Sequence, residues 1–131
     1  MRGVAKQKIL LVEKDRLLSK AIHICLSKKG YDVEVLRDME RATEYLARVR
    51  PAAVVLDLEG GDSEALHLAG HLQKGGWAKD VPLILLSGSG AETSQVTDVG
   101  HWAHIEKPFD MGELVESIQR SLKRPKLSST S

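Results

Sequence analysis

The sequence has little of three things on which specialised proteins depend: cysteine, net charge and long apolar runs. Cys25 is the only cysteine among 131 residues, which excludes an internal disulfide and a cysteine-based zinc cluster and is typical of a reducing compartment. Nineteen basic and eighteen acidic residues leave a formal net charge of +1. We therefore expect no binding to nucleic acid, because the chain has no field of one sign to attract phosphates.

The apolar run that follows the basic start of the chain ends at Val12. This run is too short for a signal peptide or a membrane span, so we expect a cytoplasmic protein that does not bind membranes. Hydrophobic residues make up 42% and charged residues 28% of the sequence, as in ordinary globular domains. The length suits one domain, in which folding buries roughly two-thirds of the surface of the unfolded chain.

What the sequence does contain is a regular alternation of strand and helix patterns. Short apolar runs predict strands that are buried on both faces of a parallel sheet, and apolar residues at helical spacing between them predict covering helices. Asp15 and Asp110 precede two of these helices as N-caps. The predicted strands cover residues 9–12, 31–35, 52–56, 81–86 and 103–105, and the predicted helices cover 16–29, 39–49, 65–72, 91–99 and 111–122.

This alternation predicts an α/β fold, a doubly wound sheet of five parallel strands with helices on both faces. We expect a short extension at residues 1–7, the domain at residues 8–124, and a tail or the start of a linker at residues 125–131, where the sequence is polar and unpatterned. Ligands of such sheets bind beyond the carboxyl ends of the strands, so the chemistry should lie there.

Polar residues follow four of the predicted strands at that edge. Glu13-Lys14-Asp15 follows the first strand, Asp57 the third, Ser87 the fourth and Lys107 the fifth. Converging strand ends would bring carboxylates, a hydroxyl and an ammonium around one point. This set is suited to accepting a phosphoryl group and then holding it.

The segments that carry these residues resemble the receiver domains of two-component response regulators. The resemblance runs from about Lys8 to Leu122, through the segments Lys8-Ile9-Leu10-Leu11-Val12-Glu13, Val54-Val55-Leu56-Asp57, Pro82-Leu83-Ile84-Leu85-Leu86-Ser87 and Lys107-Pro108-Phe109-Asp110. It implies a flavodoxin-like sheet of order 2-1-3-4-5 and a signalling domain rather than an enzyme.

The same resemblance implies a mechanism and partners. Asp57 would accept a phosphoryl group from a histidine kinase, a phosphotransfer protein or a small donor, while Ser87 and Lys107 contact that group. A conformational change would then pass the phosphorelay signal to a downstream protein or to an effector domain.

Lys14 departs from the family pattern, in which a second acid after the first strand binds magnesium. A protonated lysine cannot be a metal ligand, so a magnesium site here is weakened or absent. One hypothesis is that the Lys14 ammonium pairs with Asp57 in place of the metal, which would make the domain a pseudo-receiver that acts as a phosphorylation-independent interaction module. The other is that Lys14 points to solvent, and that Glu13, Asp57 and Glu59 hold a weak magnesium site.

His104 stands at the switch position, where the family often has tyrosine or phenylalanine. We expect a solvated histidine there, although an imidazole could add pH sensitivity. A nucleotide- or flavin-binding protein is the competing class, because the same sheet serves such proteins. The turn after the first strand has neither glycine-rich phosphate-binding motif, which argues against that class.

Overall fold

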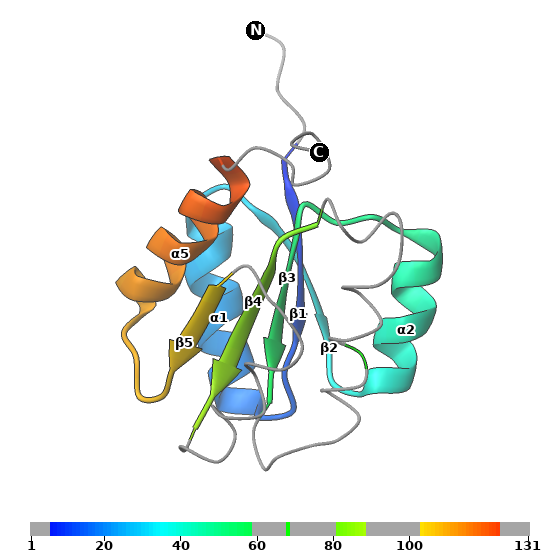
Figure 1. Ribbon diagram of the computed structural model, residues 1–131, viewed down its shortest axis with the longest axis horizontal. Helices are drawn as coiled ribbons and strands as arrows, with labels where there is room; N and C mark the ends of the chain where they lie inside the picture. Colours follow the sequence, from blue (N-terminus) through cyan, green and yellow to red (C-terminus); the bar gives the residue numbers. More distant parts are fainter. Residues whose placement is uncertain (1–5, 59–67, 69–80, 89–102, 124–131) are drawn as a thin grey trace, which may run out of the picture.

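The computed structural model describes residues 6–58, 68, 81–88 and 103–123. Five parallel strands form one sheet of order β2-β1-β3-β4-β5 (Figure 1), which confirms the predicted fold class and strand order. The elements are β1 (Lys8–Val12), α1 (Arg16–Lys28), β2 (Asp32–Leu36), α2 (Met39–Arg48), β3 (Ala53–Asp57), β4 (Leu83–Ser87), β5 (Ala103–Glu106) and α5 (Met111–Lys123).

The sheet is covered on both faces, with α1 and α5 on one side and α2 on the other (Figure 1). Successive side chains of β1 explain this arrangement, because Ile9 and Leu11 pack toward α1 and α5 whereas Leu10 and Val12 pack toward α2. Every residue of β3 and β4 is buried. Burial on both faces accounts for the continuous apolar runs of the sequence.

The helix ends lie where local chemistry places them. Asp15 accepts hydrogen bonds from the backbone N–H groups of Leu17 and Leu18, and Asp38 accepts one from Arg41. Asp110 caps α5 in the same way, with the N–H of Glu113 donating to it at 2.8 Å. Beyond α1, Gly30 adopts a φ of 97°, a conformation that glycine enters at little cost.

Several strand ends differ from the sequence prediction by a residue or two. Asp57 and Ser87 are the last residues of β3 and β4 rather than the first residues after them, because Asp57 pairs with Leu86 and Ser87 pairs with Glu106. Because of this parallel pairing, Asp57 and Ser87 belong to the ends of the strands. These positions fix their backbones more firmly than loop positions would.

The third and fourth predicted helices, at residues 65–72 and 91–99, lie outside the described residues except for Leu68. Leu68 is buried in the cluster between the sheet and α2. Within the described ranges, no helix is both long enough and apolar enough to cross a membrane. The domain boundaries at residues 8 and 124 remain predictions.

Candidate functional site

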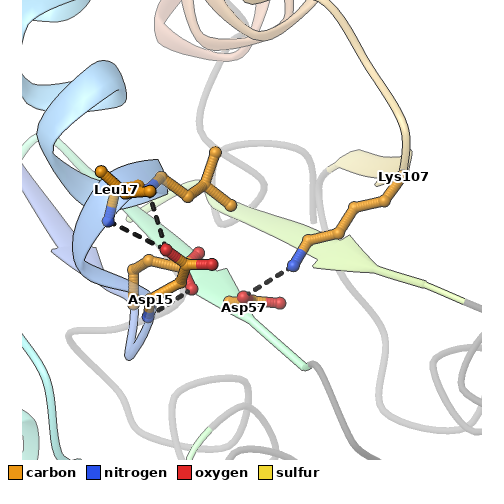
Figure 2. Close-up of polar contacts among 6 residues, drawn as sticks. Asp15, Leu17, Asp57 and Lys107 are labelled. Carbon is orange, nitrogen blue, oxygen red and sulfur yellow. Dashed lines mark hydrogen bonds and ion pairs between the residues drawn. The ribbon is translucent and has the colours of Figure 1, made fainter.

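Asp57 and Lys107 meet at the carboxyl edge of the sheet, where β3 and β5 end. The Lys107 ammonium Nζ donates a hydrogen bond to Asp57 Oδ2 at 2.8 Å, and the Asp57 side chain is only 4% exposed (Figure 2). The Lys107 backbone N–H donates to the Ser87 carbonyl, also at 2.8 Å, which ties the segment after β5 to β4. Two of the residues that were predicted to converge at this edge thus form an ion pair.

Glu13 lies directly after β1 and is almost completely buried. Its Oε2 accepts a hydrogen bond from the Asp15 backbone N–H at 3.2 Å, but Oε1 has no hydrogen-bond partner within the described part of the chain. Two causes raise the pKa of Glu13 to about 8. Burial is the larger cause, and the interaction with the Asp57 carboxyl group is the next largest. Two ionised carboxylates cannot hydrogen-bond to each other, whereas a protonated Glu13 can donate to Asp57.

This pKa changes the charge count of the site. If Glu13 were ionised, the carboxylates of Glu13 and Asp57 would balance the ammonium groups of Lys14 and Lys107. With a pKa of about 8, Glu13 is mostly protonated at neutral pH and contributes little negative charge. Asp57 is therefore the main acceptor for the Lys107 ammonium.

Lys14 and Asp15 follow Glu13, and both are exposed to solvent. Lys14 is exposed to solvent at the start of the loop, and the ion pair described on Asp57 comes from Lys107. Asp15 is engaged by the first turn of α1, as Figure 2 shows for its contact with Leu17. Its predicted role as the helix cap is confirmed.

Ser87 and His104 form a contact that the sequence analysis missed. The Ser87 hydroxyl Oγ lies within hydrogen-bond distance of His104 Nε2, and His104 is only partly exposed. The expectation of a solvated histidine is therefore wrong. The strand register could have revealed the pair, because His104 precedes by two residues the β5 partner of Ser87, so both side chains point to the same face of the sheet.

Comparisons with known proteins agree with this geometry. The sequence pattern of the family described as the response regulator receiver domain matches residues 9–119. The chain belongs to this family. As a receiver domain, it is a signalling domain of two-component systems, which confirms the resemblance and does not favour the pseudo-receiver alternative.

A curated relative illustrates how much of a response regulator this receiver domain represents. The response regulator MprA of Mycobacterium leprae is 33% identical over 121 residues, which are 91% of this chain and 52% of that protein. The chain thus spans about half the length of the curated relatives that it matches.

Two solved structures share the fold. A putative response regulator from Chloroflexus aurantiacus superposes with a TM-score of 0.82 at 22% identity, over 92% of this chain and all of that one. The chemotaxis response regulator CheY4 of Vibrio cholerae gives a TM-score of 0.78 at 20% identity, over 89% of this chain and 99% of that one. At these identities the likeness supports the fold alone.

The described residues of the receiver domain supply two oxygen donors for a cation. The partnerless Oε1 of buried Glu13 and the carboxylate of Asp57 are of the type that magnesium prefers. Glu59, the third predicted ligand, lies outside the described residues. Within the ranges described, no group of three or more metal-ligating side chains is found. Two carboxylates fit magnesium, because this ion commonly binds to one or two of them and retains several waters.

Proposed function

We propose that this receiver domain accepts a phosphoryl group on Asp57. The observation that carries the proposal is the buried Asp57 carboxylate with the Lys107 ammonium 2.8 Å away, at the edge of the sheet where ligands of this fold bind. A carboxylate oxygen attacks phosphorus, a P–O bond forms, and the bond from phosphorus to the donor breaks. The product is an acyl phosphate that water can later cleave.

The neighbouring residues supply electrostatic stabilisation for this transfer. The phosphoryl group brings negative charge into a site with little solvent, and the Lys107 ammonium offsets that charge at close range. The Ser87 hydroxyl can donate to a phosphoryl oxygen once it leaves His104. We assign no bond-making chemistry of its own to the protein beyond this self-modification, so it acts as a signalling domain rather than as an enzyme.

We further propose that Glu13 and Asp57 hold a magnesium ion, with Glu59 as the third donor. When bound, the ion would neutralise charge on the phosphoryl oxygens. The exposed ammonium of Lys14 stands in the loop next to this site and would lower its affinity for a divalent cation.

The partners follow from the same chemistry. We propose a histidine kinase or phosphotransfer protein as the phosphodonor, and a downstream protein or an attached effector domain as the recipient of the signal. A cytoplasmic location is consistent with such partners. The length of the relatives supports an effector domain, since each is about twice as long as the matched region.

The test is incubation with acetyl phosphate and magnesium, followed by intact mass spectrometry. We expect a gain of one phosphoryl group in the wild-type protein and none in Asp57→Ala. Asp32→Ala is the matched control, because it removes an exposed aspartate that pairs with Lys8 at the amino end of β2, the opposite edge of the sheet. The proposal fails if the wild-type protein gains no mass, or if Asp57→Ala gains as much as the wild type does.

A further inference from the structure

An open groove of about 570 Å³ lies between α1 and the edge strand β2. In the sheet β2 pairs only with β1 (Figure 1), so its other side is not covered by a strand in the described part of the chain. The groove is therefore walled by a helix on one side and by an edge strand on the other. The lining residues that matter below are Arg16, Leu17 and Lys20 from α1, and Val33, Val35 and Arg37 from β2 and the residue after it.

Apolar side chains form part of this groove. Leu17 is 81% exposed, the most exposed large hydrophobic residue that the structure describes. Val33 and Val35 are only partly buried against the core. A single exposed leucine is ordinary on a protein surface, but one that shares a groove with two half-covered valines offers an apolar anchor site.

Three cations line the same groove. In the described part of the chain, Arg16, Lys20 and Arg37 form no salt bridge. The carboxylates next to them are engaged elsewhere, since Asp15 caps α1 and Asp38 caps α2 while pairing with Arg41. The three cations can therefore pair with carboxylates of a partner.

The dimensions of the groove suit a helix. Arg16 to His23 extends about 10 Å along α1, and Val33 to Arg37 about 13 Å along β2, which together match roughly two turns of a helix laid between them. Apolar anchors with charged rims are the features by which grooves bind amphipathic helices. Residues 124–131 of this chain are a poor occupant, because they carry Arg124 and Lys126 and no acidic residue.

We propose that the groove between α1 and β2 is a docking surface for an acidic amphipathic helix of a protein partner. The apolar face of that helix contacts Leu17, Val33 and Val35, while its carboxylates pair with Arg16, Lys20 and Arg37. The groove is concave and partly apolar, so it suits a helix better than a flat anionic membrane or the hydrated phosphates of nucleic acid.

The probe for this proposal is a fluorescein-labelled helical peptide of about 14 residues, with leucine at i, i+3, i+4 and i+7 and glutamate elsewhere. Its matched partner has lysine in place of every glutamate. Binding is followed by fluorescence anisotropy, and the site is located by amide chemical-shift changes in the labelled receiver domain. We expect the glutamate peptide to bind and to shift the amides of Leu17, Lys20, Val33 and Val35.

Charge-reversed variants test the assignment. The double variant Lys20→Glu/Arg37→Glu should weaken the binding of the glutamate peptide by about tenfold or more. Leu17→Ser should weaken its binding by a smaller factor. Lys28→Glu/Arg48→Glu makes the same change in net charge at exposed positions outside the groove and should leave binding within about twofold. All substituted positions are exposed, and circular dichroism checks that each variant is folded.

Several results would overturn the proposal. These are no binding of the glutamate peptide, equal binding of the lysine peptide, equal weakening by the two double variants, or amide shifts that lie outside the groove. Tighter binding to anionic lipid vesicles or to duplex DNA, with the same dependence on Lys20 and Arg37, would assign the groove to those ligands instead. Self-association of the unliganded chain through Leu17 would assign it to a second copy.

These outcomes are independent of the phosphoacceptor proposal. The groove variants leave Asp57, Ser87 and Lys107 unchanged, so each should gain a phosphoryl group from acetyl phosphate at the wild-type rate. Loss of peptide binding with unchanged phosphorylation supports the groove alone.

Discussion

At the ends of β3 and β5 the site holds a buried carboxylate with an ammonium 2.8 Å away, whereas at the end of β1 it holds a buried glutamate followed by an exposed lysine. We call Asp57, Ser87 and Lys107 the acceptor half, and Glu13 and Lys14 the cation half. The acceptor half has the groups that we propose to bind and stabilise a phosphoryl group. The cation half has lost one of the two adjacent acids that the family pattern provides.

The two halves differ in how the charge of their buried carboxyl groups is compensated. The negative charge of the Asp57 carboxylate is offset by the Lys107 ammonium of the protein itself. The cation half retains one buried carboxyl group whose pKa is about 8, and it is therefore uncharged for most of the neutral pH range. A divalent cation would have to displace that proton before it could use Glu13 as a ligand.

The largest expected effect comes from breaking the acceptor half. Lys107→Ala removes the ammonium that offsets the incoming charge, so we expect the rate of phosphorylation by acetyl phosphate to fall by about 100-fold or more. Lys107→Arg keeps the charge and should retain a larger fraction of the rate. Time courses of intact mass at saturating donor measure both variants, and an Ala variant as fast as the Arg variant would contradict the assigned role.

Glu13→Gln tests the cation half through the pH dependence of stability. Because the folded pKa of about 8 lies above the ordinary value of 4.5, the folded protein retains a proton that the unfolded chain loses between these pH values. This contribution to stability is present at low pH and is lost as the pH rises toward 8. We expect the free energy of unfolding of the wild type to fall by about 1–3 kcal/mol from pH 5 to pH 8.5 because of Glu13.

The glutamine variant should show a flatter profile over the same range, as urea unfolding at a series of pH values will measure. Glu40→Gln is a suitable control, because Glu40 is exposed in the first turn of α2. Parallel profiles for the wild type and Glu13→Gln would show that Glu13 titrates as an ordinary carboxyl group.

The contact between Ser87 and His104 gives a smaller effect within the acceptor half. Ser87→Ala and His104→Phe should each lower the free energy of unfolding by about 1 kcal/mol, and the double variant should cost less than the sum. A coupling energy of about 0.5–1.5 kcal/mol from this cycle would measure the hydrogen bond. Additive effects would mean that the two side chains act independently in solution.

The smallest effect concerns the helix cap beside the cation half. Asp15→Ala removes the acceptor for the first N–H groups of α1 and should cost about 0.5–1 kcal/mol of stability. Asp110→Ala removes the equivalent cap of α5 and should cost a similar amount. If Asp15 were a metal ligand as well, Asp15→Ala but not Asp110→Ala would also weaken magnesium binding, which the account does not predict.

Much of the fold could be predicted from the sequence, because burial on both sheet faces leaves a clear mark in the apolar runs. The run at residues 52–56 and the run at residues 81–86 correspond to β3 and β4, and the caps at Asp15 and Asp110 lie where their spacing indicated. Strand ends were less predictable, because they depend on pairing with a neighbour. Asp57 belongs to β3 only because Leu86 lies opposite it.

The meeting of Asp57 and Lys107 could also be predicted, because parallel strand ends must converge on one edge. The protonation of Glu13 could not, since it depends on burial and on the proximity of Asp57, which a sequence does not encode locally. The partner of His104 was missed for a similar reason. Its register against Ser87 is set by the pairing of β4 with β5. Glu59 and its predicted role lie outside the described residues, so that role remains a prediction.

The most direct test of the central claim is the magnesium dependence of phosphorylation in the wild type and in Lys14→Asp, measured side by side by intact mass. The account predicts that both proteins reach the same extent of modification on Asp57, and that the wild type needs about tenfold more magnesium to reach half of it. A wild-type protein that stays unmodified at every magnesium concentration, beside a Lys14→Asp variant that is modified, would contradict it. The acceptor half would then be insufficient without the missing acid.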